Sequence, residues 1–222
     1  MTDRADPGTT PRTRIRRLPE RSVHERAAAH AVLDAALVGH VAVVQDGQPY
    51  VLPVAFARRD DAVVFHGSTG SRLMRALADG QPTCFTATLV DGLVLARSAF
   101  ESSMNYRSIM VLGIAHRLTG DEELDALRTI SEHLLPGRWA EIRHPSAKER
   151  AATLTLELPL DECSVKIRTG GPADLPEDLA DPALRGVWAG DVPIVESFST
   201  PVPSPDLAPE VPVPEYVARW RR

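Results

Sequence analysis

A loop rich in glycine and hydroxyl side chains lies between two apolar segments in the first half of the chain, and its residue types suit anion binding. The run Ala62–Phe65 predicts a short buried strand, and residues 71–78 predict a helix. The sequence between them, His66-Gly67-Ser68-Thr69-Gly70-Ser71-Arg72, offers unpaired backbone N–H groups, glycines that permit close approach, and an arginine whose planar fork suits phosphate oxygens. We therefore expect a phosphate cradle here, although an ordinary strand–turn–helix capped by Ser71 explains the same residues.

The composition limits the kind of partner that the chain can take. Its 222 residues carry a net charge of −5, which disfavours nucleic acid because phosphate neutralisation needs a basic face. Cys84 and Cys163 are far apart and no histidine cluster accompanies them, so neither a disulfide framework nor a metal site is predicted. No signal peptide or membrane-spanning run is apparent, which predicts a cytoplasmic protein with no membrane partner, and the excess of arginine over lysine fits a GC-rich bacterial genome.

Hydrophobic periodicity predicts a helix followed by a series of short strands. Ser22 and Glu25 have the spacing of a capping box, and the apolar positions after them predict a helix over 22–37. Two turn-forming pairs, Asp46-Gly47 and Asp91-Gly92, predict hairpins between neighbouring strands. The predicted strands cover residues 39–45, 50–57, 62–65, 83–89, 93–100, 108–118, 153–158 and 163–167.

The second half of the chain adds helices and a proline-rich tail. Residues 121–135 predict an amphipathic helix that ends at Pro136-Gly137. Its shared apolar face consists of Leu124, Leu127, Ile130 and Leu134. We expect a flexible arm over 1–20, a barrel domain over 21–170, and an extended segment over 171–222 that packs on the barrel or on a partner subunit. Mostly antiparallel strands with few helices predict a mainly β (β+α) fold, a closed or split β-barrel with peripheral helices.

Several stretches of the chain match one known family when they are taken together. The most specific are His66-Gly67-Ser68 with Ser71-Arg72, and Asn105-Tyr106-Arg107-Ser108. The other matching stretches are residues 47–54, 91–100, 109–113, 136–139, 164–168 and 187–190. The chain resembles the FMN-binding split β-barrels of the pyridoxamine 5'-phosphate oxidase-like family, in the flavin-nucleotide-binding branch close to the nitroimidazole-resistance flavoproteins.

The resemblance implies a homodimer with two FMN sites between the subunits. It places Ser71 and Arg72 at the phosphate, and His66–Ser68 along the ribityl chain and the edge of the ring. Val51–Val54 would run beside the isoalloxazine, and a strand near the dimer interface would supply a further group. The implied cofactor-binding residues are Val51, Leu52, Pro53, Val54, His66, Gly67, Ser68, Ser71, Arg72, Tyr106, Arg107 and Ser108.

Two departures from pyridoxamine phosphate oxidase itself limit what the resemblance implies. Leu73 stands where that enzyme places a lysine directly after the Ser-Arg pair, which removes one cation from the phosphate site. The enzyme's C-terminal substrate-binding Trp and Arg-His segment has no counterpart in this sequence. Pyridoxamine phosphate oxidase activity is therefore not expected.

Four further residues each allow two interpretations. His66 is either a flavin neighbour and candidate proton donor, or a histidine packed at the end of a strand. Arg97 falls in the predicted strand 93–100, where a charge needs either a salt-bridge partner or an anionic ligand. Trp139 and Trp188 are either core residues, which we expect, or lids that stack on a ring.

The leading functional interpretation is an FMN-dependent oxidoreductase that acts on a small organic molecule, with the flavin supplying the redox chemistry. A non-enzymatic protein that binds or stores flavin is the first alternative. In the second alternative the same cleft holds FAD, the deazaflavin F420 or haem, with His66 as an exposed imidazole ligand of the haem iron. No Ser/His/Asp order or paired-carboxylate motif supports hydrolase chemistry.

Overall fold

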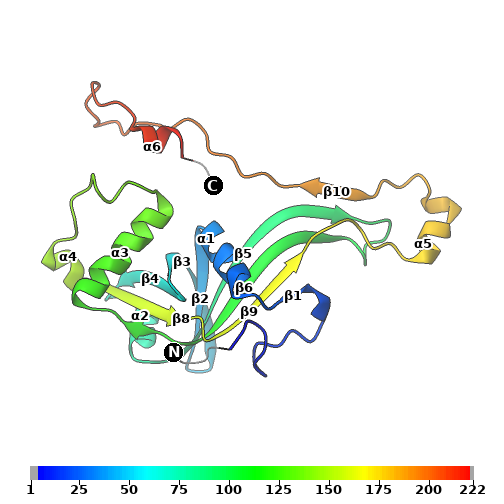
Figure 1. The fold of residues 1–222 in the computed structure, drawn as a ribbon, viewed down its shortest axis with the longest axis horizontal. Helices are drawn as coiled ribbons and strands as arrows, with labels where there is room; N and C mark the ends of the chain where they lie inside the picture. Colours follow the sequence, from blue (N-terminus) through cyan, green and yellow to red (C-terminus); the bar gives the residue numbers. More distant parts are fainter. Residues whose placement is uncertain (1–4, 221–222) are drawn as a thin grey trace.

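The computed structural model describes residues 5–220, and Figure 1 shows an antiparallel sheet that curls into a barrel with helices at its periphery. Among the described residues, the strands pair in the order β1-β9-β6-β5-β2-β3-β4-β8-β7, with β10 on β5. The barrel closes because β7 continues directly from β6 and pairs with β8 near the far end of that order. The mainly β class predicted from the sequence is confirmed.

The elements have the following bounds. The strands are β1 (Ser22–Val23), β2 (Val38–Gln45), β3 (Gln48–Arg59), β4 (Ala62–Ser68), β5 (Pro82–Leu95), β6 (Ser103–Ile114), β7 (His116–Arg117), β8 (Thr153–Pro159), β9 (Glu162–Arg168) and β10 (Gly190–Pro193). The helices are α1 (Arg26–Ala35), α2 (Arg72–Ala78), α3 (Gly120–Leu134), α4 (Ala147–Ala151), α5 (Pro176–Ala180) and α6 (Glu215–Ala218), with short 3-10 turns at Pro19–Arg21 and Pro182–Leu184. No helix within residues 5–220 combines the length and the apolarity needed to cross a bilayer.

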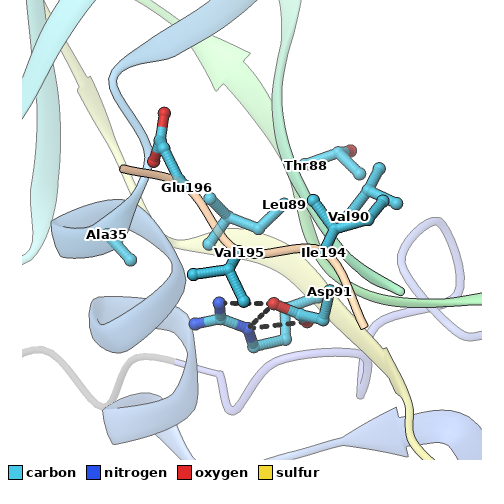
Figure 2. A pocket seen from close by; sticks show the side chains of 9 residues that line it. Ala35, Thr88, Leu89, Val90, Asp91, Ile194, Val195 and Glu196 are labelled. Carbon is cyan, nitrogen blue, oxygen red and sulfur yellow. Dashed lines mark hydrogen bonds and ion pairs between the residues drawn. The ribbon is translucent and has the colours of Figure 1, made fainter. Parts of the chain in front are cut away.

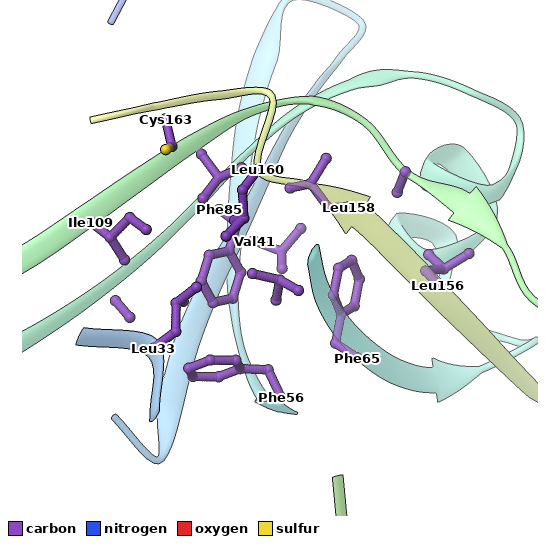
Figure 3. Packing of buried hydrophobic residues seen from close by; sticks show 14 of the residues in the cluster. Leu33, Val41, Phe56, Phe65, Phe85, Ile109, Leu156, Leu158, Leu160 and Cys163 are labelled. Carbon is purple, nitrogen blue, oxygen red and sulfur yellow. The ribbon is translucent and has the colours of Figure 1, made fainter. Parts of the chain in front are cut away.

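Aromatic and aliphatic side chains from the sheet and from α1 fill the barrel (Figure 3). The rings of Phe56 and Phe85 meet edge to face with their centroids 4.9 Å apart. Phe85 also packs on Gly39, where an added Cβ would come within 2.2 Å of the ring. Each buried aromatic side chain stabilises the fold by roughly 1.5–3 kcal/mol. This packing holds β2, β3 and β5 together and so fixes the strand that borders the predicted cofactor cleft.

Strand β3 passes from one half of the barrel to the other. Its first part, residues 48–55, pairs with β2, whereas its last part, residues 56–59, pairs with β4. The side of residues 48–55 that faces away from β2 is therefore an open edge among the described strands. Pro53 lies on this part and pairs with His40, which is a position where a strand with one open edge tolerates a proline.

The hairpin predicted at Asp91-Gly92 is wrong. Strand β5 runs without interruption through these residues, and its register with β6 shifts between Val90 and Gly92 as a β-bulge. Gly92 has no room for a side chain because a Cβ there would lie 3.0 Å from the carbonyl oxygen of Val192 in β10. The Asp-Gly pair therefore marks a bulge and the close approach of a third strand.

Both predicted long helices form, but each differs from its expected details. Helix α1 begins at Arg26, and Ser22 pairs with Lys166 as part of β1, so the expected capping box does not form. Helix α3 directs Glu123, Ala126 and Ile130 toward the sheet. The apolar face inferred from Leu124, Leu127 and Leu134 is only partly covered, which leaves apolar side chains beside α3 available to line cavities.

The two ends of the chain behave differently. Residues near the N-terminus lie along β9, where Gly8 N–H donates to the Cys163 carbonyl and Arg12 pairs with Glu162. The C-terminal end leaves the barrel after β9, returns as β10 and then runs across the molecule to α6 (Figure 1). Trp188, expected in the core, is 63% exposed on this outer path.

Candidate functional site

The loop between β4 and α2 has the predicted path, but most of its N–H groups already have partners. Thr69 N–H donates to the Ala152 carbonyl, Gly70 N–H to Ser68 Oγ, and Ser71 N–H to the Ser68 carbonyl. The expectation that these three N–H groups point unpaired at a ligand is therefore wrong. The loop uses them to hold its own turn in place ahead of α2.

Ser71 caps the helix as the simpler interpretation proposed. Its Oγ accepts a hydrogen bond from Met74 N–H. A serine hydroxyl that accepts one bond can still donate its own hydrogen, so capping and anion contact are compatible. Gly67 has a packing role: a Cβ there would meet Met74 Cγ at 2.8 Å, so the glycine lets α2 lie close against β4.

Arg72 joins the loop to the open edge of β3. Its guanidinium carbon lies 4.8 Å from the centroid of the Tyr50 ring, a cation–π contact that holds an otherwise exposed side chain. Tyr50 directly precedes Val51–Val54, of which Val51 and Leu52 are 57% and 46% exposed. The structure therefore brings Arg72 and Ser71 beside the start of the predicted ring-binding segment.

Tyr106, Arg107 and Ser108 do not join that group within one chain. They lie on β6, and β5 and β2 separate β6 from β3. Arg107 forms a bidentate pair with Asp91 of the bulge, at 2.7 and 3.0 Å, which holds the pKa of Arg107 above its ordinary value. Ser108 Oγ donates to the Lys166 carbonyl.

The Arg107–Asp91 pair lies at the wall of a cavity of about 600 Å³ that the C-terminal chain covers (Figure 2). Ile194 and Val195 close one side, and Leu89 and Val90 of β5 close the other (Figure 2). Arg107 is already paired with Asp91, and the other charged residue of the wall is the acid Glu196, so this cavity offers no free cation.

A second cavity, of about 350 Å³, has His66 in its wall and is mostly apolar. Helix α3 supplies Leu127, Ile130 and Leu134 to it, and the loop after α3 supplies Trp139 and Ile142. The three α3 residues belong to the apolar face that the sequence predicts for this helix. Trp139, expected in the core, lies at this cavity instead.

His66 lines this cavity, and the residue remains exposed to solvent. Desolvation lowers its pKa below the ordinary value of 6.5, so the ring is neutral at physiological pH. Its partner across the strands is Thr155, which is 1% exposed and whose Oγ1 has no hydrogen-bond partner. Arg143 and Arg150 add positive charge at the cavity wall, paired with Glu149 and Glu123.

Residues 136–146, which we call the roof loop, cover the cavity. Glu132 fixes the start of this loop, since its two carboxylate oxygens accept the N–H groups of Gly137 and Trp139 at 2.6 and 2.8 Å. The Trp139 ring stacks on His144 with centroids 4.7 Å apart. At the end of the loop, Ser146 and Glu149 form a capping box at the start of α4.

A family model described as pyridoxamine 5'-phosphate oxidase matches residues 25–167. The chain belongs to this family. The resemblance inferred from its motifs is therefore confirmed, and a search of curated protein sequences gave no further match.

Two solved structures of the family resemble the chain over nearly its whole length. Flavocytochrome Anf3 from Azotobacter vinelandii is 38% identical, with a TM-score of 0.89, over 97% of this chain and 99% of that one. An FAD and haem binding protein from Mycobacterium smegmatis is 40% identical, with a TM-score of 0.83, over 89% and 95%. A candidate 5-nitroimidazole antibiotic resistance protein from Bacteroides thetaiotaomicron, 20% identical with a TM-score of 0.56 over 66% and 86%, shares the fold.

Sequence reasoning missed the roof loop and the contribution of α3 to the cavity beside His66. Glu123 shares the buried helix face with Ala126 and Ile130, and a charged residue on that face hides it from apolar periodicity. Arg150 pairs with Glu123 at 2.8 Å, which lets the carboxylate be buried. Arg97, the other ambiguous charge, pairs with Asp174 at 2.6 Å, which is the salt-bridge interpretation and leaves no free cation there.

Proposed function

We propose that this chain binds a flavin nucleotide and a haem, and that it is a redox protein acting on a small organic molecule. The observation that carries the proposal is the apolar cavity with a neutral imidazole in its wall, next to the strand end that leads to Arg72. Two relatives at 38% and 40% identity are named for a flavin together with a haem, which supports the pairing of these groups.

The residues around His66 fit a haem. Leu127, Ile130 and Ile142 provide apolar surface for a flat macrocycle, and an unprotonated imidazole has the lone pair that iron ligation needs. Arg143 lies at the cavity wall and is exposed, and a propionate would have to share it with its partner Glu149. When bound, the haem would exchange single electrons, whereas the flavin exchanges one or two.

The open edge of β3 fits a flavin. The backbone groups of Val51–Val54 that face away from β2 are available to the polar rim of an isoalloxazine, and the Tyr50 ring orients Arg72 toward a phosphate. Leu73 carries no charge. Arg72 would therefore provide a larger share of the interaction with the phosphate than it would if a lysine followed it. The resemblance favours FMN, whereas the relative that is 40% identical is named for FAD. The titration described below therefore includes both flavins.

We further propose a cytoplasmic homodimer. Tyr106–Ser108 and the β3 edge lie apart in one chain, and a second chain is the source that would bring them to one flavin. Apolar side chains on the sheet support this, with Leu93 and Met104 at 43% and 44% exposure. Val195 and Val202 on the C-terminal segment, at 84% and 91% exposure, would find cover on the partner.

Titration of the ligand-free protein with FAD, FMN and hemin tests the proposal. We expect saturable quenching of the fluorescence of one flavin and a sharp Soret band with hemin. His66→Ala should weaken hemin binding more than about tenfold because iron loses its protein ligand, while flavin binding stays within about threefold.

His116→Ala is the matched control, since it removes an exposed imidazole from β7. Its hemin and flavin titrations should match those of the wild type. Wild-type protein that binds neither flavin, or His66→Ala that binds hemin as tightly as the wild type, would contradict the proposal.

A further inference from the structure

We propose that helix α6 is a latch that holds the roof loop in place at the open His66 cavity, so that its contacts limit how often this wall of the cavity moves away and widens the opening. That the ligand passing through this opening is a haem rests on the proposed function. The opening itself is a property of the chain. The latch consists of Tyr216 and the part of the roof loop that it contacts, residues 137–141.

Tyr216 contacts the roof loop at three places. Its hydroxyl donates to a Glu141 carboxylate oxygen and accepts a hydrogen bond from Arg138 Nη1 at 3.3 Å. Its ring covers Gly137, where an added Cβ would lie 3.4 Å from Tyr216 Cγ. Gly137 has a φ of +91°, so the loop turns sharply at the point that the ring covers. The tyrosine thus contacts the loop from its turn at Gly137 as far as Glu141.

Among the described residues, few other contacts hold the roof loop where it faces α6. Glu132 holds its beginning through the N–H groups of Gly137 and Trp139, and the Ser146 capping box holds its end. Between them lie Ile142 and Arg143, which line the cavity, and Arg143 pairs with Glu149 at the surface. Movement of residues 138–143 therefore uncovers the cavity, and Tyr216 is the contact from outside the loop that opposes this movement.

Helix α6 is held in place by the chain before it, which we call the strap (residues 194–214). The strap begins where Ile194 N–H donates to the Asp91 carbonyl and crosses above the barrel to α6 (Figure 1). Six of its residues are proline, at positions 201, 203, 205, 209, 212 and 214, and these restrict its unfolded conformations. Phe198 and Trp220 meet with ring centroids 3.9 Å apart, which ties the strap to the residue that follows α6. The strap and α6 are therefore tied to each other, and the contacts of Tyr216 join them to the roof loop.

Tyr216→Phe tests the latch because it removes both hydrogen bonds and keeps the ring on Gly137. Hydrogen exchange of the ligand-free protein, read by mass spectrometry, should be about fivefold faster in peptides covering 136–146, while β4 and β8 keep their protection. Tyr216→Ala should accelerate the same peptides further, since the ring is lost too. Glu215→Gln is the control, because it breaks only the exposed pair with Arg219 on the outer side of α6.

Transfer of hemin from the loaded protein to apomyoglobin gives the second measurement. Tyr216→Phe should release hemin several-fold faster with little change in flavin affinity. Unchanged exchange of residues 136–146 in both Tyr216 variants would overturn the latch, as would equal acceleration throughout the barrel. If the wild type takes up no hemin, the proposed function fails, and the exchange experiment still decides whether the latch exists.

Discussion

Replacement of Arg72 by alanine tests whether this side chain binds the phosphate of the flavin. Arg72 contacts the Tyr50 ring at 4.8 Å and is followed by Leu73, and it is the cation that the resemblance places at the phosphate. A lost hydrogen bond to a charged group costs about 1.5–3 kcal/mol. This corresponds to flavin binding that is weaker by about ten- to 150-fold at 25 °C.

Fluorescence titration with the flavin that the wild type binds measures this loss of affinity. Three further variants separate the effect of the guanidinium geometry, of the contact with Tyr50 and of net charge. Arg72→Lys should recover only part of the affinity, since lysine lacks the planar fork. Tyr50→Leu should cost less than Arg72→Ala, because it loosens the guanidinium without removing it. Arg117→Ala, an exposed arginine on β7, controls for net charge. Equal affinity in Arg72→Ala and the wild type would refute the assignment of Arg72 to the phosphate.

Two further predictions concern stability. Gly39→Ala should lower the free energy of unfolding by about 3 kcal/mol or more, because its Cβ would lie 2.2 Å from the buried Phe85 ring. Gly186→Ala is the control: its Cβ would enter open space, so the free energy of unfolding should change by less than about 0.5 kcal/mol. Urea denaturation that gives the two variants equal midpoints would contradict this packing. For His66, the lowered pKa means that the unfolded chain binds a proton more readily, so the ligand-free protein should lose stability as the pH falls below 6.5. His66→Gln should lose less between about pH 7.5 and about pH 5.5 in urea titrations, and an equal loss in both proteins would show that this ring is not desolvated.

Local patterns in the sequence were enough to predict the strands of the barrel core and the turn before α2. Alternating apolar residues predicted β2, β8 and β9 closely, because one face of each strand lies in the core whatever its partners are. Ser71 capped α2 as its type and position indicated, since capping depends only on the neighbouring backbone.

The features that sequence patterns misplaced depend on residues distant in the chain. Asp91-Gly92 has the composition of a hairpin turn, but pairing with β6 and β10 on its two sides keeps β5 extended there. Ser22 has the spacing of a helix cap, yet pairing with Lys166 of β9 draws it into the sheet. In each case contacts with another strand outweighed a local preference worth about 1 kcal/mol.

The cavity beside His66 was hidden from the sequence for a related reason. Periodicity identifies the more apolar face of α3 but not whether that face meets a sheet or a ligand space. The structure turns Ala126 and Ile130 to the sheet with Glu123, whose charge Arg150 pairs, and leaves Leu127 and Leu134 at the cavity. An apolar helix face is therefore evidence of burial against something, and the rest of the fold decides what that is.

The visible absorption spectrum of the protein as purified, with its released cofactors identified by mass, tests the central claim most directly. The account predicts the two broad bands of a flavin together with a Soret band, and masses of FAD or FMN and of haem. A protein that lacks either cofactor as purified and also fails to take up that cofactor when it is added would contradict it.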